Sequence, residues 1–148
     1  MAELTSILSR SEEETLGIGR RIGGACSGGE LIGLVGPLGS GKSVLARGIA
    51  RGLGVRGSIR SPSFNLMREY RGRLVLRHWD LFRLDAGFDS LGLVESVEDD
   101  AVVVVEWADR WEALGRYCTG TVFLEYGENE TERGLRWTGD VPGLTEPE

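Results

Sequence analysis

A glycine-rich segment between Gly36 and Ser43 carries residue types that bind phosphate. It reads GPLGSGKS and fits the P-loop pattern G-x-x-x-x-G-K-[ST]. The glycines let backbone N–H groups turn inward around a phosphate, and the start of a following helix adds the positive end of its dipole. Lys42 would bridge the β- and γ-phosphates, and the Ser43 hydroxyl would bind Mg²⁺. The segment therefore predicts a site for magnesium and a nucleoside triphosphate.

Lysine occurs once in this chain, and it occurs in that segment. Sixteen arginines supply all the other basic side chains. A slim, flexible ammonium fits between phosphates where a planar guanidinium does not. The composition therefore supports a phosphate-binding role for Lys42.

A second magnesium ligand is expected at the end of an apolar strand. Residues 101–105 read AVVVV, and Glu106 follows them directly. Ligands of open α/β sheets bind beyond the carboxyl ends of the strands, so Glu106 would lie near the P-loop. There it would take the Walker B position and meet the magnesium ion. Trp107 would pack beside the site or simply fill the core.

Two further segments hold candidate groups. Asp80 lies in HWDLFRL, residues 78–84, where a strand gives way to a loop. It could orient a water, hold a magnesium-bound water or act as a base. His78 is the single histidine, and a lone histidine is more often structural than catalytic. Residues 61–66, SPSFNL, could sense the nucleotide as a switch segment does, or form an ordinary turn.

A sheet with flanking helices must position these residues. A first helix would begin with a capping box of Ser11 and Glu14 and end at Gly28-Gly29. Period-2 and apolar runs predict strands, period-3.6 runs predict helices, and a helical turn is expected at 108–114. The expected strands are 5–8, 31–35, 63–70, 73–79, 101–105, 121–126 and 134–138, and the other helices are 44–53 and 89–97. We expect an α/β fold of the single-domain P-loop NTPase type, with a mixed parallel/antiparallel sheet.

Composition sets limits on the class of protein. The 148 residues suit one domain, which we place at residues 1–138, followed by a disordered tail at 139–148. No apolar run approaches the ~20 residues of a membrane helix, and no secretory signal is visible, so we expect a cytoplasmic protein that does not bind membranes. Cys26 and Cys118 match no metal or redox spacing and should be reduced thiols.

Charge is unevenly distributed along the chain. A net charge of −6 argues against a free-standing nucleic-acid binder, because such proteins need clustered cations. Residues 42–83, however, hold ten basic residues and two acidic ones. That segment could face an anionic ligand or partner, or it could be a scattered solvated surface.

Together these pieces resemble the TsaE (YjeE) family of small bacterial P-loop ATPases over residues 5–138. The most specific segments are HWDLFRL and VVEWADR, accompanied by GPLGSGKS, SPSFNL and the N-terminal helix with its Ser11 cap. The resemblance implies a role in forming threonylcarbamoyladenosine beside the anticodon of certain tRNAs. It also implies weak ATP hydrolysis by the chain alone, and work with a TsaD–TsaB pair that itself acts on the tRNA.

The resemblance also implies roles for individual residues. Ser43 and Glu106 would hold Mg²⁺, and Asp80 would be the acid most needed for hydrolysis of ATP, with Lys42 assisting. Ser11, Thr15 and Arg133 would lie near the adenine. The remaining nucleotide contacts would come from the P-loop and the residue after it, namely Gly39, Ser40, Gly41, Lys42, Ser43 and Val44.

Some positions depart from the family pattern. Pro37 stands where the family usually has aspartate, and proline has no backbone N–H to give to phosphate. Val44 replaces a frequent second threonine, and SPS replaces SPT. Two other functions stay open from the residues alone. One is a small-molecule kinase on the same scaffold, and the other is a nucleotide-dependent interaction module with little turnover.

Overall fold

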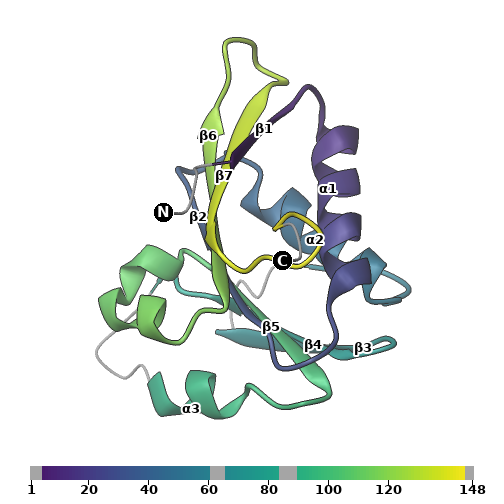
Figure 1. Ribbon diagram of the computed structural model, residues 1–148, viewed down its shortest axis with the longest axis vertical. Helices are drawn as coiled ribbons and strands as arrows, with labels where there is room; N and C mark the ends of the chain where they lie inside the picture. The colour runs from purple at the N-terminus through teal and green to yellow at the C-terminus, as the bar shows by residue number, and fades with distance from the viewer. Residues whose placement is uncertain (1–4, 61–65, 84–89, 146–148) are drawn as a thin grey trace.

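The computed structural model describes residues 5–60, 66–83 and 90–145 (Figure 1). Seven strands form one sheet in the order β1-β7-β6-β2-β5-β4-β3. The strands are β1 (Thr5–Ser9), β2 (Leu31–Val35), β3 (Met67–Arg71), β4 (Val75–Asp80), β5 (Ala101–Glu106), β6 (Gly120–Tyr126) and β7 (Arg133–Gly139). The helices are α1 (Glu12–Ala25), α2 (Lys42–Gly52), α3 (Ser90–Glu95) and the 3₁₀ turns η1 (Ala108–Arg110) and η2 (Glu112–Arg116).

The sheet is mixed, as expected. Strands β6, β2, β5 and β4 run parallel in its centre, whereas β7, β1 and β3 are antiparallel to their neighbours. Parallel neighbours end at the same edge, so the register brings the ends of three strands together. Glu106 on β5 is opposite Asp80 on β4 and opposite Leu34, one residue before the end of β2.

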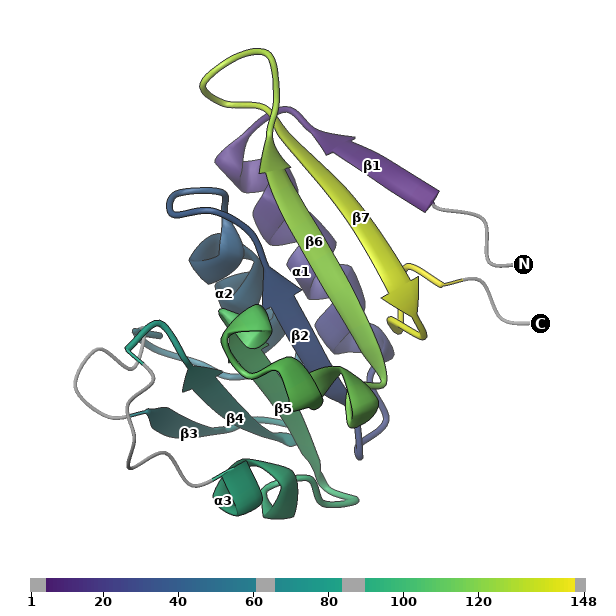
Figure 2. The ribbon, with the colours of Figure 1, turned by 90° about the vertical axis from the view of Figure 1, so that its left-hand side faces the viewer.

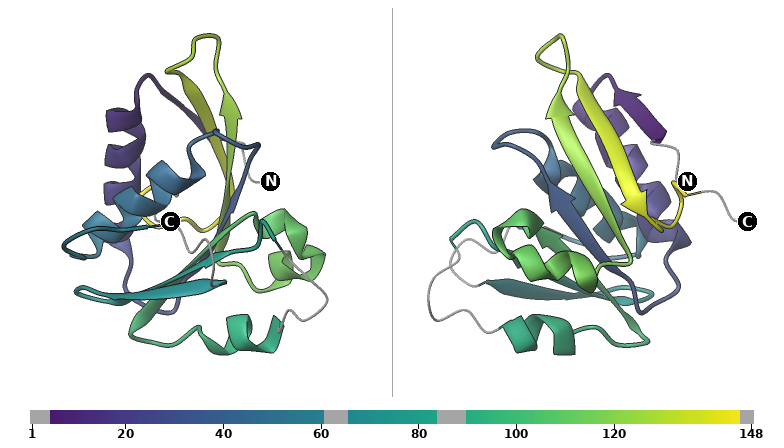
Figure 3. Two further views of the ribbon diagram at one scale, coloured as in Figure 1. Left: turned by 180° about the vertical axis from the view of Figure 1, so that it is seen from behind. Right: turned by 60° about the vertical axis from the view of Figure 1, so that its left-hand side comes forward.

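Two apolar cores lie on opposite faces of the sheet. Helices α1 and α2 cover one face, and α3 with η1 and η2 covers the other (Figures 2 and 3). Alternate residues of β5 serve the two cores: Val102 and Val104 pack on the side of α1 and α2, while Val103 and Val105 pack on the other. Burial on both faces explains why this strand has no polar alternation.

Helix α1 starts as expected but ends earlier. The Ser11 hydroxyl accepts the Glu14 N–H at 3.0 Å, while the Glu14 carboxylate accepts the N–H of Arg10 rather than that of Ser11. The helix ends at Ala25 with Cys26 as its C-cap, so the expected end at Gly28-Gly29 is wrong. The physical reason is a long-range cap, because the Arg73 guanidinium donates to the carbonyls of Gly23 and Cys26 at 2.9 and 3.1 Å.

The hairpin of β3 and β4 is confirmed with shifted bounds. We expected its first strand at 63–70; it is β3 (Met67–Arg71), and residues 63–65 lie outside the described residues. The turn lies at residues 72–74 rather than at Arg71-Gly72, because Arg71 still pairs with Val75 in the ladder and the N–H of Gly72 bonds the carbonyl of Leu74 at 3.2 Å.

Residues 140–145 are not a disordered tail. Val141 is fully buried, Leu144 is 7% exposed, and both belong to the core beneath α1. The N–H groups of Leu144 and Thr145 bond the carbonyl of Val141 at 3.0 and 2.9 Å. Our expectation of a disordered tail is therefore wrong for residues 140–145, because two apolar side chains in this mostly polar segment are buried in the core. Residues 146–148 lie outside the described part of the chain.

Over the ranges that the structure describes, no helix is long and apolar enough to cross a membrane. Both cysteines are free, Cys26 buried and Cys118 half-buried. Burial raises the pKa of Cys26 to about 12, and burial also raises the pKa of Cys118. The neutral thiol is therefore favoured over the thiolate at both positions.

Candidate nucleotide-binding site

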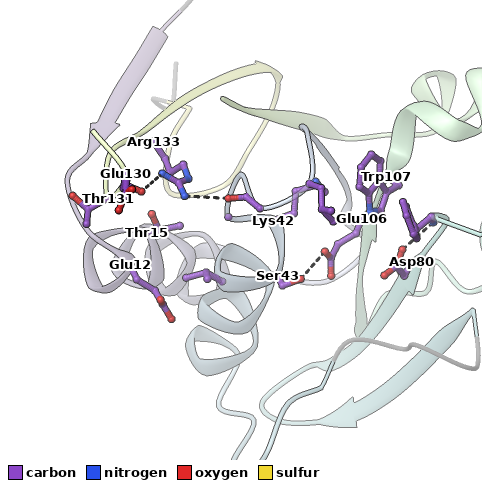
Figure 4. Close-up of a pocket in the computed structure, with 15 residues that line it drawn as sticks. Glu12, Thr15, Lys42, Ser43, Asp80, Glu106, Trp107, Glu130, Thr131 and Arg133 are labelled. Carbon is purple, nitrogen blue, oxygen red and sulfur yellow. Dashed lines mark hydrogen bonds between the residues drawn. The ribbon is translucent and has the colours of Figure 1, made fainter. Parts of the chain in front are cut away.

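A pocket of about 450 Å³ opens where β2, β4 and β5 end (Figure 4). It brings together residues that are far apart in the chain. Most of the residues expected at a nucleotide line it, namely Thr15, Gly39, Gly41, Lys42, Ser43, Val44, Asp80, Glu106 and Arg133. Ser11 and Ser40 are not among the lining residues: Ser11 caps α1, and Ser40 is fully buried within the P-loop itself.

The P-loop has the backbone conformation that its glycines permit. Gly39 and Gly41 have φ angles of 77° and 106°, in the left-handed region that other residues rarely adopt. Gly41 is the N-cap of α2 and offers no side chain to the first turn of that helix. The N-terminus of α2 therefore faces the pocket with N–H groups suited to an anion.

Lys42 is held within the loop. Its side chain is buried, and Nζ donates to the carbonyls of Gly36 and Pro37 at 2.5 and 2.8 Å. The ring of Trp107 covers the ammonium, 4.0 Å from Nζ to the ring centroid. Burial lowers the pKa of Lys42, while the carboxylates of Glu106, Asp109 and Asp80 oppose that shift. Pro37, which lacks an N–H, thus takes part through its carbonyl instead.

Ser43 and Glu106 meet at the floor of the pocket. The Ser43 hydroxyl donates to Glu106 Oε1 at 3.0 Å, as Figure 4 shows. Glu106 is 2% exposed. A hydroxyl and a carboxylate oxygen are ligands that Mg²⁺ accepts, and Mg²⁺ commonly completes its shell with phosphate oxygens and water. The described residues hold no group of three or more His, Cys, Asp and Glu that would bind a metal alone. Ser43 and Glu106 would thus supply two oxygen ligands to a magnesium ion whose other ligands are phosphate oxygens and water.

Asp80 lies beside Glu106 at the end of β4. Its Oδ1 accepts the N–H of Phe82 at 2.9 Å. Burial raises the pKa of Asp80, and the nearby Glu106 carboxylate adds to the increase. The Phe82 hydrogen bond, His78 and Lys42 act in the opposite direction. A half-buried acid with a raised pKa is suited to accept a proton or orient a water.

The other wall of the pocket comes from α1 and the β6–β7 loop. Arg133 donates to the Gly39 carbonyl at 3.1 Å and to the carbonyls of Glu130 and Glu132 at 2.7 Å, which ties this loop to the P-loop. Thr15 is 2% exposed, and its hydroxyl is 2.7 Å from the Ser9 hydroxyl. Glu12, Glu130 and Thr131 also line this wall. Glu12 lies in the segment from Ser11 to Thr15 that the resemblance places near the adenine, whereas no periodic or motif signal pointed to Glu130 or Thr131.

Aromatic side chains cover the opposite wall. Trp107 has φ 57° and ψ 41°, and is the only non-glycine residue with positive φ in the described chain. Its ring lies 5.0 Å from the ring of Phe82, and the Arg110 guanidinium stands over both rings. Trp107 therefore belongs to the site rather than only to the core. Phe82 and Arg110 were missed, although both lie in the motifs that contain Asp80 and Glu106.

The basic segment of residues 42–83 does not turn its arginines to this pocket. Of its nine arginines, all within the described ranges, none lines the pocket. Arg51 and Arg73 instead donate to backbone carbonyls at the far ends of α2 and α1. Positive charge in the pocket comes from Lys42 and Arg133.

Comparison with known proteins gives a consistent family. The model of the family "Threonylcarbamoyl adenosine biosynthesis protein TsaE" matches residues 9–135. The tRNA threonylcarbamoyladenosine biosynthesis protein TsaE of Treponema pallidum is 38% identical over 105 residues, which cover 70% of this chain and 78% of that protein. TsaE of Mycobacterium bovis is 43% identical over 109 residues, 66% of this chain and 64% of the relative.

A solved structure shares the fold. The crystal structure of Bacillus subtilis YdiB superposes with a TM-score of 0.76 and 26% identity, covering 94% of this chain and 87% of that one. This likeness agrees with a single-domain α/β fold built on a mixed seven-stranded sheet. The family match over residues 9–135 includes every residue that lines the pocket, and the chain therefore belongs to the TsaE family of tRNA threonylcarbamoyladenosine biosynthesis proteins.

Proposed function

We propose that this chain is a magnesium-dependent ATPase that supports threonylcarbamoyladenosine formation on tRNA together with a TsaD–TsaB complex. The observation that carries the proposal is the 3.0 Å contact between Ser43 Oγ and Glu106 Oε1, directly beside a buried P-loop lysine. Family membership supplies the role in tRNA modification. The pocket supplies the reason to assign nucleotide chemistry to it.

Ser43 and Glu106 would hold the magnesium ion. Bound there, Mg²⁺ would neutralise charge on the phosphate oxygens of ATP. Lys42 would leave the carbonyls of Gly36 and Pro37 to meet the β- and γ-phosphates. Backbone N–H groups from Gly39 to Val44 and the N-terminus of α2 would surround the same anion.

Asp80 would act on the water that attacks the phosphate. It lies on β4, directly opposite Glu106 on the neighbouring strand β5, and it lines the same pocket. From there its carboxylate would orient the water or take its proton. Thr15 and Arg133 would face the base and ribose end, because their wall lies across the P-loop from Asp80 (Figure 4).

Exposed apolar side chains around the pocket support a protein partner. Leu38 at the tip of the P-loop is 71% exposed, Tyr126 at the end of β6 is 56% exposed, and Phe82 is 42% exposed. Large exposed hydrophobic side chains near a functional site are typical of protein interfaces. A TsaD–TsaB complex that covers this rim would couple nucleotide turnover to its own modification of tRNA. This chain would then act on tRNA indirectly, through that complex.

A small-molecule kinase is less well supported. Kinases on this scaffold close arginines over the phosphates. Among the described residues, Arg133 is the one arginine that lines the pocket, and its guanidinium is already engaged by three backbone carbonyls. No specific observation favours an acceptor substrate.

A turnover assay tests the proposal. The purified chain, ATP and Mg²⁺ should release phosphate slowly, and addition of TsaD–TsaB should accelerate release. Chelation of the metal with EDTA should stop the release of phosphate. The Glu106→Gln variant, which removes a proposed ligand of the metal, should release phosphate more slowly than the wild type. Transfer of phosphate to a metabolite, or unchanged turnover in the Glu106→Gln variant, would contradict the proposal.

A further inference from the structure

The two oxygens of the Glu106 carboxylate have different partners. Oε1 accepts from the Ser43 hydroxyl at 3.0 Å, on the side of the pocket. Oε2 is 2.6 Å from Nε2 of His78, on the adjacent strand β4. Because an ionised carboxylate only accepts, Nε2 is the donor in this pair. The carboxylate is thus divided between a pocket contact and a protein contact.

His78 is fixed in place. It is 2% exposed, and its backbone pairs with Val104 in the parallel ladder of β4 and β5. Its second ring nitrogen, Nδ1, is buried and has no hydrogen-bond partner within the described part of the chain. Burial of an unpaired polar nitrogen costs free energy, which an apolar side chain of similar size would avoid. The hydrogen bond to Glu106 is therefore the contact that distinguishes this imidazole from an apolar side chain of similar size.

The geometry points to His78 as a positioning residue that restricts Glu106 to one oxygen and thereby favours Mg²⁺ over Ca²⁺. The inference rests on the proposed function, since Ser43 and Glu106 must be the metal ligands. His78 does not itself line the pocket. It acts through Glu106, as hydrogen-bond partners of metal ligands commonly do.

The selectivity follows from the needs of the two ions. Mg²⁺ is small, requires near-octahedral geometry and is held through few carboxylate oxygens, whereas Ca²⁺ accepts both oxygens of one carboxylate in a larger, flexible shell. With Oε2 occupied by His78, Glu106 has Oε1 to offer beside the Ser43 hydroxyl. Without the imidazole the carboxylate can rotate and present both oxygens, which suits Ca²⁺ better.

A matched pair of substitutions separates positioning from core filling. His78→Gln keeps an N–H donor at a similar distance along the side chain, and His78→Leu removes the donor while keeping an apolar volume. Binding of a non-hydrolysable ATP analogue is measured by calorimetry with saturating Mg²⁺, with saturating Ca²⁺ and with EDTA. Thermal unfolding of each variant shows whether it folds. If His78→Leu does not fold, His78→Asn takes its place, because its shorter amide does not reach Glu106.

We expect His78→Leu to weaken binding of the Mg²⁺ complex by roughly 10–100-fold, the range found for such partners of metal ligands. Its binding of the Ca²⁺ complex should be unchanged or tighter, and binding in EDTA should equal that of the wild type. His78→Gln should recover most of the preference for Mg²⁺. Electron paramagnetic resonance of Mn²⁺ should show an altered metal environment in His78→Leu alone.

Two results would overturn the inference. One is a folded His78→Leu variant with the wild-type ratio of Mg²⁺ to Ca²⁺ affinity. The other is equal loss for both ions in the Gln and Leu variants, which would mark His78 as a packing residue. A wild-type chain whose analogue binding ignores Mg²⁺ would instead refute the proposed function, so the two failures are distinguishable.

Discussion

Gly19 of α1 and Gly48 of α2 bring the two helices into backbone contact. A Cβ on Gly48 would lie 2.9 Å from Gly19 Cα and 2.3 Å from the carbonyl oxygen of Leu16. No side chain fits in that space, so the approach of α1 fixes the position of α2. Because α2 begins at Lys42, this contact also sets where the P-loop stands relative to the sheet.

Replacement of Gly48 by alanine should therefore separate the helices. We expect Gly48→Ala to lower the free energy of unfolding by roughly 1–3 kcal/mol, as overpacking does, and to weaken ATP binding. Gly17→Ala is the matched control, since a Cβ there meets nothing within 4 Å. It should stabilise the protein by about 0.5–1 kcal/mol through helix propensity. Urea denaturation of both variants measures this, and equal effects would refute the close contact.

Lys42→Ala should weaken nucleotide binding. A charge-assisted hydrogen bond is worth about 1.5–3 kcal/mol, and the described pocket has no second lysine to replace it. Calorimetry with Mg²⁺ and ATP measures the change, with Arg56→Ala as a control at an exposed position away from the pocket. Undiminished affinity in Lys42→Ala would contradict the P-loop assignment.

Asp80→Asn should separate stability from activity. The folded state raises the Asp80 pKa above its ordinary value of 3.8, chiefly by burial, so the ionised carboxylate opposes folding. Below pH 3.8 the acid is protonated in both states and this effect vanishes. As pH rises through the folded pKa the wild type loses stability, and Asp80→Asn should become the more stable form by thermal unfolding.

The same substitution should depress ATP hydrolysis by roughly 10²–10⁴-fold, the usual contribution of a general acid or base, while binding of ATP is retained. Asparagine keeps an oxygen that can accept the Phe82 N–H, so the turn at the end of β4 should persist. Turnover equal to that of the wild type would show that Asp80 does not serve the water.

The left-handed backbone conformation of Trp107 should make the stability of the protein depend on which small residue replaces it. Both Trp107→Gly and Trp107→Ala lose the ring contacts with Lys42 and Phe82. Alanine at φ 57° is strained by about 1–2 kcal/mol, and glycine avoids this strain. Glycine loses more backbone entropy on folding, however, which cancels part of its advantage. We expect Trp107→Gly to be the more stable of the two by about 0.5–1 kcal/mol in urea denaturation. The reverse order would mean that the left-handed conformation is not retained.

Leu144→Ala should destabilise the fold although it lies near the end of the chain. Leu144 is 7% exposed and packs in the core beneath α1, so its loss should cost about 2 kcal/mol, the low end for a buried leucine. Thr138→Ala, at an exposed position on β7, is the control. Equal melting temperatures for these two variants would show that residues 140–145 contribute nothing to folding.

Local patterns were sufficient for most elements of this fold. The apolar run at 101–105 and the GPLGSGKS segment predicted a strand, a P-loop and a helix that the structure contains, because periodicity and glycine content act within a few residues. Our expectations for the end of α1 and for residues 140–145 were wrong. The Arg73 hydrogen bonds to the end of α1 and the burial of Val141 both depend on partners distant in the chain.

The sequence by itself determined the phosphate loop, the acid at the end of β5 and the resemblance to TsaE, since each is a short run of fixed residue types. Only the tertiary structure decided that His78 holds Glu106 and that Trp107 covers Lys42. Both pairings arise from the order and register of strands. Those depend on which faces the whole chain can bury together, and no local pattern encodes them.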